Sequence, residues 1–397
     1  MSRTFYIIGV GMAAPDGLTG EAAHAIEAAD VVFATERLTA VCARAVVRPF
    51  DQLAAAAIDA FARTAAILVS GDVGFFSAAG RLRAQLAPHG GVRLICGLSS
   101  MQYFCARLGV SYDDACVRSL HGRAGSALGA VSYHKKIFLL TGGVQTVPNV
   151  CRALTEAGLG GLTVHLGENL GAENERIETT TAEVLAKEPC GDLAVLLIEN
   201  PNAVNAREPV RDSMLTRAKV PMTKEEVRWV SVSRLAVQPR DTVWDVGAGT
   251  GAVTLELARK ASDGLVYAIE REDEAIALLR ENRRNLGGYN MQIVEGAAPD
   301  ALETLPAPDC VFVGGSGGAM RRILEIAKEK NPAVRVVVTA IALETLHETQ
   351  AALTELGFAN VEVVQIAAAR GRAVGSYTMM IANNPVFILS GGGTDAK

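Results

Sequence analysis

Three glycines at alternate positions form the sharpest chemical pattern in this sequence of 397 residues. The glycine loop Gly247–Gly251 follows an apolar run that contains Asp245, and a helical pattern begins at Ala252. Glycine lets the backbone approach a bound molecule, because it has no Cβ to collide with it. Glu270 ends the next apolar run, close to the spacing of a carboxylate that accepts from ribose hydroxyls. Asp245 is placed to orient the loop or to accept a hydrogen bond from a cationic amine.

Two cofactors fit this loop. Gly247, Gly249 and Ala252 match the G-x-G-x-x-G/A fingerprint of dinucleotide-binding folds. The preceding acidic residue and the pair Thr250-Gly251 resemble instead the D-x-G-x-G-T-G loop of class I S-adenosylmethionine methyltransferases. We expect S-adenosylmethionine and keep an NAD-dependent oxidoreductase as the alternative. The loop alone also permits a methyltransferase that acts on RNA or protein.

Further segments of the second half occur in a fixed order, namely Pro221–Arg228, Glu295–Pro299, Val313–Gly318, Thr339–Thr345, Ala369–Arg372 and Thr378–Pro385. With the glycine loop they resemble the decarboxylating precorrin methyltransferase family of cobalamin biosynthesis, over residues 206–390. Ala297 departs from this family, which usually has an acidic residue there. The resemblance implies cofactor contacts from Thr223, Asp245, Gly247, Ala248, Gly249, Thr250, Gly251, Glu270 and Ala298. It places the tetrapyrrole beside Gly315, Ser316 and Gly317, and beside the segment 339–345.

Four segments of the first half resemble the tetrapyrrole methylase family, which uses S-adenosylmethionine on a different α/β fold: Gly9–Gly11, Gly71-Asp72, Gly97–Ser100 and Ser119–Arg123. The resemblance covers residues 3–200 and implies a second cofactor site at Gly9, Gly11, Gly71, Asp72, Ser99 and Ser100. Arg123 and His121 are candidate substrate contacts, and a guanidinium group suits a substrate with many carboxylates. The family loop usually reads Gly-Pro-Gly-Asp, whereas Met12 follows Gly11 here. A first half that only binds, without catalysis, therefore stays open.

Together the two resemblances imply one reaction sequence. Precorrin-6Y would be methylated at meso carbons 5 and 15 and would lose carbon dioxide from the acetate at carbon 12, giving precorrin-8. The second half would handle the decarboxylation and carbon 15, and the first half carbon 5. Electron-rich meso carbons attack a sulfonium methyl directly, so we expect no covalent nucleophile. Holding the reactants in line and excluding water would carry the catalysis.

The elements that must position these residues alternate between strand and helix in both halves. Ile137–Leu140 and Leu193–Ile198 are continuous apolar runs, which predict strands buried on both faces. We expect an α/β protein with a tetrapyrrole-methylase-type domain over residues 1–205 and a class I, Rossmann-like domain over residues 206–397. The polar stretch 200–220, with two prolines, is the predicted linker.

Two local patterns stand out in the second half. Thr223 is predicted to cap the helix that follows it, because Glu226 stands three residues later in a capping box. Late in the chain, strands are predicted without helices between them, which indicates an antiparallel hairpin at the end of an otherwise parallel sheet.

Composition limits the partners. The formal net charge is −5, so the chain lacks the basic balance typical of nucleic-acid binding. No apolar run is long enough to span a bilayer. The seven cysteines are scattered without a C-x-x-C pair, so no metal site is predicted. We expect a cytoplasmic enzyme with a tetrapyrrole substrate, without nucleic-acid or membrane partners, and the resemblance implies a homo-oligomer.

Overall fold

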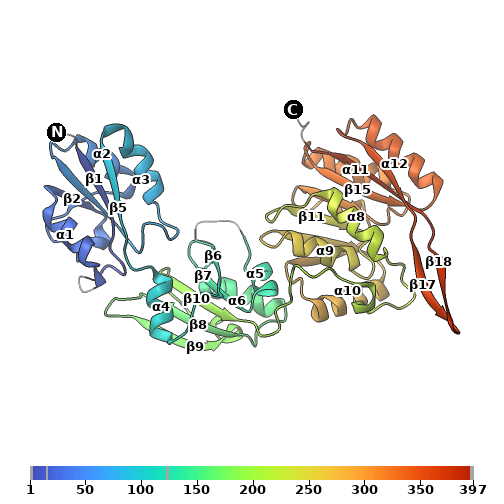
Figure 1. The fold of residues 1–397 in the computed structure, drawn as a ribbon, viewed down its shortest axis with the longest axis horizontal. Helices are drawn as coiled ribbons and strands as arrows, with labels where there is room; N and C mark the ends of the chain where they lie inside the picture. Colours follow the sequence, from blue (N-terminus) through green and yellow to red (C-terminus); the bar gives the residue numbers. More distant parts are fainter. Residues whose placement is uncertain (1–2, 15–16, 122–124, 394–397) are drawn as a thin grey trace. The chain divides into compact units, whose positions relative to one another are not determined.

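The computed structural model describes residues 3–14, 17–121 and 125–393. The chain folds into two compact units, which are described separately (Figure 1). Unit 1 comprises residues 1–123 and 136–199, and unit 2 comprises residues 124–135 and 200–397. Unit 2 therefore includes a short segment from the first half of the sequence. The assignment of residues 1–205 and 206–397 as separate domains stays a prediction.

Unit 1 contains two five-stranded sheets. The first is parallel, in the order β3-β2-β4-β1-β5. Its strands are β1 (Thr4–Gly9), β2 (Val31–Ala34), β3 (Val46–Val47), β4 (Thr64–Val69) and β5 (Gly91–Ile95). Helix α1 (Gly20–Ala28) packs into one apolar cluster, and α2 (Leu53–Asp59) and α3 (Ala79–Leu86) pack into another. Alternate residues of β1 enter the two clusters, so this sheet is buried on both faces.

The second sheet of unit 1 has the order β6-β7-β10-β8-β9, and only its β6–β7 pair is parallel. Its strands are β6 (Cys116–Ser119), β7 (Lys136–Leu140), β8 (Thr163–Glu168), β9 (Arg176–Thr181) and β10 (Ala194–Glu199). The helices of this part are α4 (Ser100–Leu108), α6 (Val147–Glu156) and α7 (Ala182–Leu185). Residues 137–139 and 194–198 are buried, as the apolar runs predicted, whereas Leu193 lies before β10 and is exposed.

Unit 2 is built on a seven-stranded sheet in the order β13-β12-β11-β14-β15-β19-β16. The strands are β11 (Thr242–Val246), β12 (Leu265–Glu270), β13 (Met291–Glu295), β14 (Cys310–Val313), β15 (Arg335–Ala340), β16 (Glu362–Ile366) and β19 (Val386–Gly392). All pair in parallel except β19, which is antiparallel to both neighbours. The strand order reverses between β11 and β14, which is where open α/β sheets form a binding crevice.

Helices cover both faces of this sheet. One apolar cluster joins it to α8 (Glu225–Leu235), α9 (Ala252–Lys260) and α10 (Asp273–Leu286). The other joins it to α11 (Met320–Lys330) and α12 (Leu343–Glu355). Val243 enters the first cluster and Trp244 the second, because successive strand residues point to opposite faces. The short helix α5 (Leu128–Tyr133) comes from the segment 124–135 and contacts α9.

A separate antiparallel hairpin, β17 (Ala369–Val374) and β18 (Tyr377–Ala382), extends from unit 2 (Figure 1). It confirms the predicted hairpin near the end of a mainly parallel sheet. The predicted capping box is wrong: α8 begins at Glu225 with Lys224 as its N-cap, and Thr223 does not cap it. The carboxylate of Glu226 instead accepts hydrogen bonds from Arg370. None of the helices in the described ranges is both long and apolar enough to cross a membrane.

Candidate functional site

The glycine loop forms the floor of a pocket in unit 2. Strand β11 ends at Val246, and Gly247, Gly249 and Gly251 all have positive φ angles, of 73°, 56° and 79°. A Cβ on Gly247 would lie 2.8–3.1 Å from backbone atoms of Gly315. Only glycine allows this close approach of two loops, so the alternate glycines have a steric cause as well as a conformational one.

Asp245 lies beneath this loop with an incomplete set of hydrogen bonds. Its side chain is fully buried, and its Oδ2 accepts a hydrogen bond from the hydroxyl of Thr254. Its Oδ1 has no hydrogen-bond partner within the described residues, and neither has the buried hydroxyl of Thr250. Burial, with a smaller contribution from the nearby charge of Glu270, raises the pKa of Asp245 to about 7, against the opposing effect of the hydrogen bond from Thr254. Two unsatisfied polar atoms at a pocket floor indicate a site for a polar or cationic ligand group.

Glu270 lies at the end of β12 and braces the loop. Its carboxylate accepts hydrogen bonds from the backbone N–H of Gly249 at 2.8 Å, of Arg271 at 2.8 Å and of Glu272 at 3.0 Å. A carboxylate has about four acceptor positions, so capacity for a ribose hydroxyl remains. The predicted ribose acceptor therefore also has a structural role, which is to hold Gly249 at the pocket.

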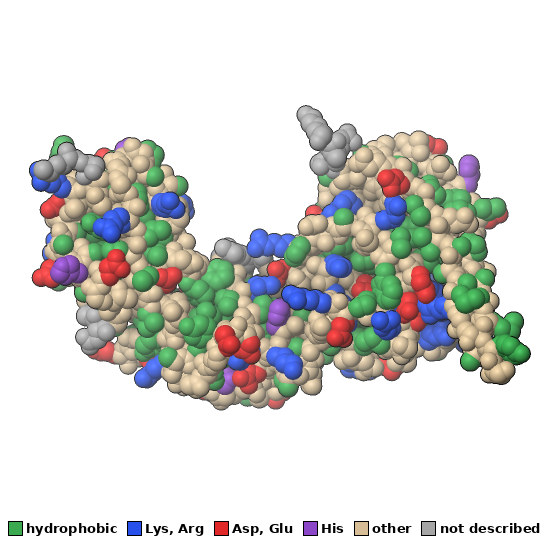
Figure 2. All heavy atoms as spheres, in the orientation of Figure 1, with side chains coloured by type: hydrophobic (Ala, Val, Ile, Leu, Met, Phe, Trp, Pro, Cys, Tyr) green, Lys and Arg blue, Asp and Glu red, His purple; other side chains and the backbone are tan. Residues whose placement is uncertain are grey.

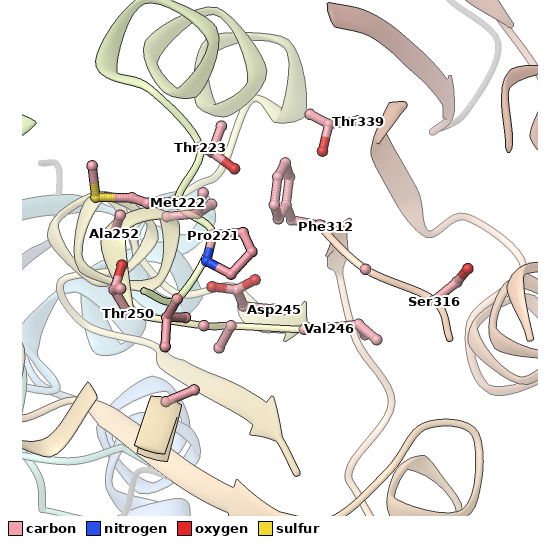
Figure 3. A pocket seen from close by; sticks show the side chains of 18 of the residues that line it. Pro221, Met222, Thr223, Asp245, Val246, Thr250, Ala252, Phe312, Ser316 and Thr339 are labelled. Atoms are coloured by element: carbon pink, nitrogen blue, oxygen red, sulfur yellow. The ribbon is translucent and has the colours of Figure 1, made fainter. Parts of the chain in front are cut away.

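The pocket above this floor has a volume of about 1170 Å³. Small-molecule pockets span about 300–1,000 Å³, so this one has room for a cofactor and part of a second molecule. In Figure 3 the side chains of Thr223 and Thr339 lie on either side of the Phe312 ring. The lining includes these sequence-predicted residues: Thr223, Asp245, Gly247, Ala248, Gly249, Thr250, Glu270, Ala298, Gly315, Ser316 and Gly317. Gly251 is outside the lining, and a Cβ there would meet the side chain of Leu279.

Several lining residues were not predicted as site residues. Phe312 comes from β14, and Asn383 and Asn384 come from the segment between β18 and β19. Arg271 also lines the pocket, with a guanidinium nitrogen 3.7 Å from the position of a Cβ on Gly317. The pair Asn383-Asn384 belonged to a family-like segment, which was a usable signal. Phe312 reads in the sequence as an ordinary strand residue and gave none.

The predicted loops of unit 1 also come together. Gly9, Gly71 and Gly97 pack so closely that a Cβ on Gly9 would lie 2.7 Å from the Gly71 oxygen and 2.8 Å from the Gly97 nitrogen. Gly11 and Gly71 form an isolated β-bridge. Asp72 accepts hydrogen bonds from the backbone N–H of Gly74 at 2.8 Å and of Gly97 at 3.2 Å. Asp72 therefore ties two of the loops together.

Ser99 and His121, also predicted as site residues of unit 1, have local partners. Ser99 caps α4 in a capping box with Gln102, and Ser100 is the first residue of that helix. A ring nitrogen of His121 lies 3.2 Å from the Thr141 carbonyl oxygen, and Gly142 leaves space for this ring. Arg123 lies outside the described residues. Among the residues that are described, no group of His, Cys, Asp or Glu is arranged to hold a metal ion.

Known proteins resemble both parts of the chain. Residues 4–186 match the tetrapyrrole (corrin/porphyrin) methylases, and residues 217–391 match the precorrin methyltransferase domain. The chain is 29% identical over 351 residues to the precorrin-6Y C(5,15)-methyltransferase [decarboxylating] of Sinorhizobium sp. This match covers 84% of each chain. It is 36% identical over 187 residues to the probable cobalt-precorrin-6B C(15)-methyltransferase (decarboxylating) of Saccharolobus solfataricus, covering 46% of this chain and 94% of the relative. The chain belongs to the decarboxylating precorrin methyltransferases.

Membership of the decarboxylating precorrin methyltransferases makes this chain an enzyme of cobalamin biosynthesis. A second relative supports the same family: the chain is 42% identical over 181 residues to the probable cobalt-precorrin-6B C(15)-methyltransferase (decarboxylating) of Methanothermobacter thermautotrophicus, covering 45% of this chain and 93% of that relative. These findings confirm the predicted methyltransferase rather than the oxidoreductase. They imply S-adenosylmethionine as the methyl donor.

The pocket of unit 2 fits this donor on its own features. The unpartnered Oδ1 of Asp245 suits a cationic group, and the glycine loop leaves bare backbone beside it. Glu270 stands one strand away, where the carboxylate can accept further hydrogen bonds. The contacts of individual residues with the donor stay predictions.

Proposed function

We propose that this decarboxylating precorrin methyltransferase has one S-adenosylmethionine site in each unit and acts on precorrin-6Y. It methylates carbons 5 and 15 and removes carbon dioxide from the acetate at carbon 12, giving precorrin-8. The name of the Sinorhizobium relative supports both positions. The shorter relatives are named as C(15)-methyltransferases (decarboxylating), and residues 217–391 match the precorrin methyltransferase domain. We therefore assign carbon 15 and the decarboxylation to unit 2, and carbon 5 to unit 1.

The observation that carries this proposal is the unpartnered oxygen of Asp245 under the glycine loop. When bound, S-adenosylmethionine supplies an electrophilic methyl group next to a sulfonium charge. Asp245 would accept a hydrogen bond from its ammonium group, and Glu270 would accept from its ribose. The neighbouring segment 221–223 would cover the donor and exclude water, which strengthens these electrostatic contacts.

The other half of the pocket would hold the tetrapyrrole. The pocket has space for a large ring beside the loop 315–317, and Phe312 and Thr339 lie at the edge of this space. The substrate's meso carbon supplies the electron pair of the new carbon–carbon bond, and the pair of the broken sulfur–carbon bond stays on sulfur. In the decarboxylation, the pair from the broken carbon–carbon bond is delocalised into the macrocycle until a proton arrives. The chain's contribution is to hold the reacting atoms in line.

Calorimetric titration of the full chain with S-adenosylmethionine tests the two sites. We expect about two equivalents bound by the wild-type chain and about one by the variant Glu270→Ala, because unit 1 keeps its own site. Glu295→Ala is the matched control: Glu295 is the register partner of Glu270 on β13, is exposed, and lies outside the pocket lining. One equivalent in the wild-type chain, or two in Glu270→Ala, would contradict the assignment. Mass spectrometry of the product should show two added methyl groups and one lost carboxyl group.

We also infer a homo-oligomer that works in the cytoplasm without a nucleic-acid partner. Figure 2 shows hydrophobic side chains along the hairpin β17–β18, and the exposed ones are Val374, Tyr377, Met379, Met380 and Ile381. An isolated two-stranded hairpin is marginally stable, so contact with a second copy would stabilise it. The net charge of −5 disfavours nucleic acid. Sedimentation of the wild-type chain and of Met380→Lys tests the oligomer; equal monomeric masses would contradict it.

A further inference from the structure

Five charged side chains meet where helix α8 begins. Arg370, from β17, donates to both carboxylate oxygens of Glu226, at 2.7 Å each. It also donates to Asp212 at 3.1 Å and lies 3.5 Å from Glu225. Asp212 in turn accepts a hydrogen bond from Arg228 at 3.1 Å, and its own backbone N–H donates to Glu225 at 2.8 Å. Three carboxylates are therefore held together by two guanidinium groups.

This cluster reaches the pocket in two ways: Glu226 itself lines the pocket, and Arg228 contacts the segment before α8. The Arg228 side chain is fully buried, and it donates a hydrogen bond at 2.7 Å to the backbone oxygen of Thr223. The cofactor wall, which we define as residues 219–224, lines the pocket. The other side of this wall contacts the glycine loop, because the Pro221 oxygen lies 3.3 Å from the position of a Cβ on Gly249. The wall is thus fixed between the glycine loop and the arginine cluster.

Arg370 is the more exposed of the two arginines, and it lies within 3.5 Å of all three carboxylates of the cluster. The formal charge of the five side chains is −1, and it becomes −2 without Arg370. Glu226 would lose a bidentate partner, and its carboxylate would face Glu225 and Asp212 with Arg228 as the remaining cation. The hydrogen bonds from Arg370 also lower the pKa of Glu226. Repulsion between these carboxylates would loosen the first turn of α8 and the wall before it.

We propose that Arg370 is a positioning residue for the donor site: through Glu226 and Asp212 it fixes the cofactor wall, and it thereby couples the hairpin β17–β18 to donor binding. This inference rests on the proposed function, in which this pocket binds S-adenosylmethionine. Arg370 touches neither reactant. Its effect should therefore fall on donor affinity and leave the turnover at saturating donor nearly unchanged.

The chain offers a matched control for Arg370. Arg372 lies two residues further along β17, on the same face of the hairpin, and its side chain forms no ion pair or hydrogen bond within the described ranges. Both tryptophans, Trp229 and Trp244, belong to unit 2, so fluorescence of the full chain follows donor binding to this unit. We expect Arg370→Ala to weaken S-adenosylmethionine binding about tenfold, and Arg370→Lys to weaken it several-fold because lysine cannot bind a carboxylate in two places. Arg372→Ala should bind like the wild type.

A second readout does not depend on the donor. Hydrogen exchange of the backbone amides in residues 219–224 should be faster in unliganded Arg370→Ala than in Arg372→Ala. Glu226→Gln should produce a similar effect, and the double variant Arg370→Ala with Glu226→Gln should be no worse than Arg370→Ala alone. If exchange and affinity in Arg370→Lys and Arg370→Ala match the Arg372→Ala control, the inference is wrong. If exchange is faster in Arg370→Ala but wild-type unit 2 binds no S-adenosylmethionine, the positioning role is supported and the proposed function is refuted instead.

Discussion

Replacing Asp245 by asparagine should remove a pH-dependent loss of stability from unit 2. Burial raises the pKa of this carboxyl from 3.8 to about 7. The folded chain therefore keeps the proton that the unfolded chain releases near pH 4. The stabilisation from this proton is complete below about pH 4 and is lost as the pH rises through about 7. The amide of Asp245→Asn has nearly the same shape but does not titrate.

The size of the effect follows from the shift. A difference of about 3 pK units, at about 1.4 kcal/mol each, corresponds to about 4 kcal/mol between the fully protonated and fully ionised states. About 3 kcal/mol of this falls between pH 5 and pH 8. The free energy of unfolding of Asp245→Asn, relative to that of the wild type, should therefore rise by about 3 kcal/mol over this range.

Urea unfolding of the full chain, followed by tryptophan fluorescence, measures this difference because Trp229 and Trp244 both lie in unit 2. All other titrating groups are shared, so comparing the two proteins isolates Asp245. Curves of unfolding free energy against pH that run parallel for the two proteins would refute the reasoning. A cationic donor favours the ionised carboxylate, so wild-type affinity for S-adenosylmethionine should weaken below pH 7, whereas that of Asp245→Asn should not.

Two further substitutions test the packing around the site. Gly247→Ala should destabilise unit 2 by about 1–3 kcal/mol, because the φ of Gly247 is 73° and the added Cβ meets the Gly315 backbone. Gly315→Ala is the control. Its Cβ has open space around it, so the free energy of unfolding should change by less than about 0.5 kcal/mol. Tyr133→Phe should cost about 1–3 kcal/mol in urea unfolding, because it leaves the buried Oδ1 of Asn290 without its donor, whereas Tyr267→Phe should cost less. Equal losses within either pair would contradict the corresponding contact.

The local part of the site could be predicted from the sequence. A glycine loop between a strand and a helix, followed by an acid at the end of the next strand, is a short-range pattern. Its physical causes, such as bare backbone at Gly247, lie within a few residues of the motif. The loop, the α/β class and the late hairpin are therefore present in the structure as predicted. The protonation of Asp245 was not predictable, because it depends on burial beneath several elements.

Two features that the sequence did not indicate depend on long-range contacts. Thr223 and Glu226 match a capping box, but the Glu226 carboxylate binds Arg370, 144 residues later, and Thr223 does not cap the helix. The segment 124–135 stands in the first half of the sequence and yet belongs to unit 2. There Tyr133 donates a hydrogen bond to Asn290, 157 residues away. Neither contact has a local sequence signal.

The floor and the walls of the pocket come from different segments of the chain, and this difference determines which residues can set the specificity for the tetrapyrrole. The floor comes from one continuous motif and, in the proposed function, contacts the donor. The walls come from the segment before α8, the loop after β14 and the segment after the hairpin, which are separated by dozens of residues. A change in the floor therefore alters donor binding directly, whereas a wall can shift when a distant ion pair such as Arg370–Glu226 changes. Differences in the tetrapyrrole that is accepted should accordingly be sought in the walls and in the residues that hold them.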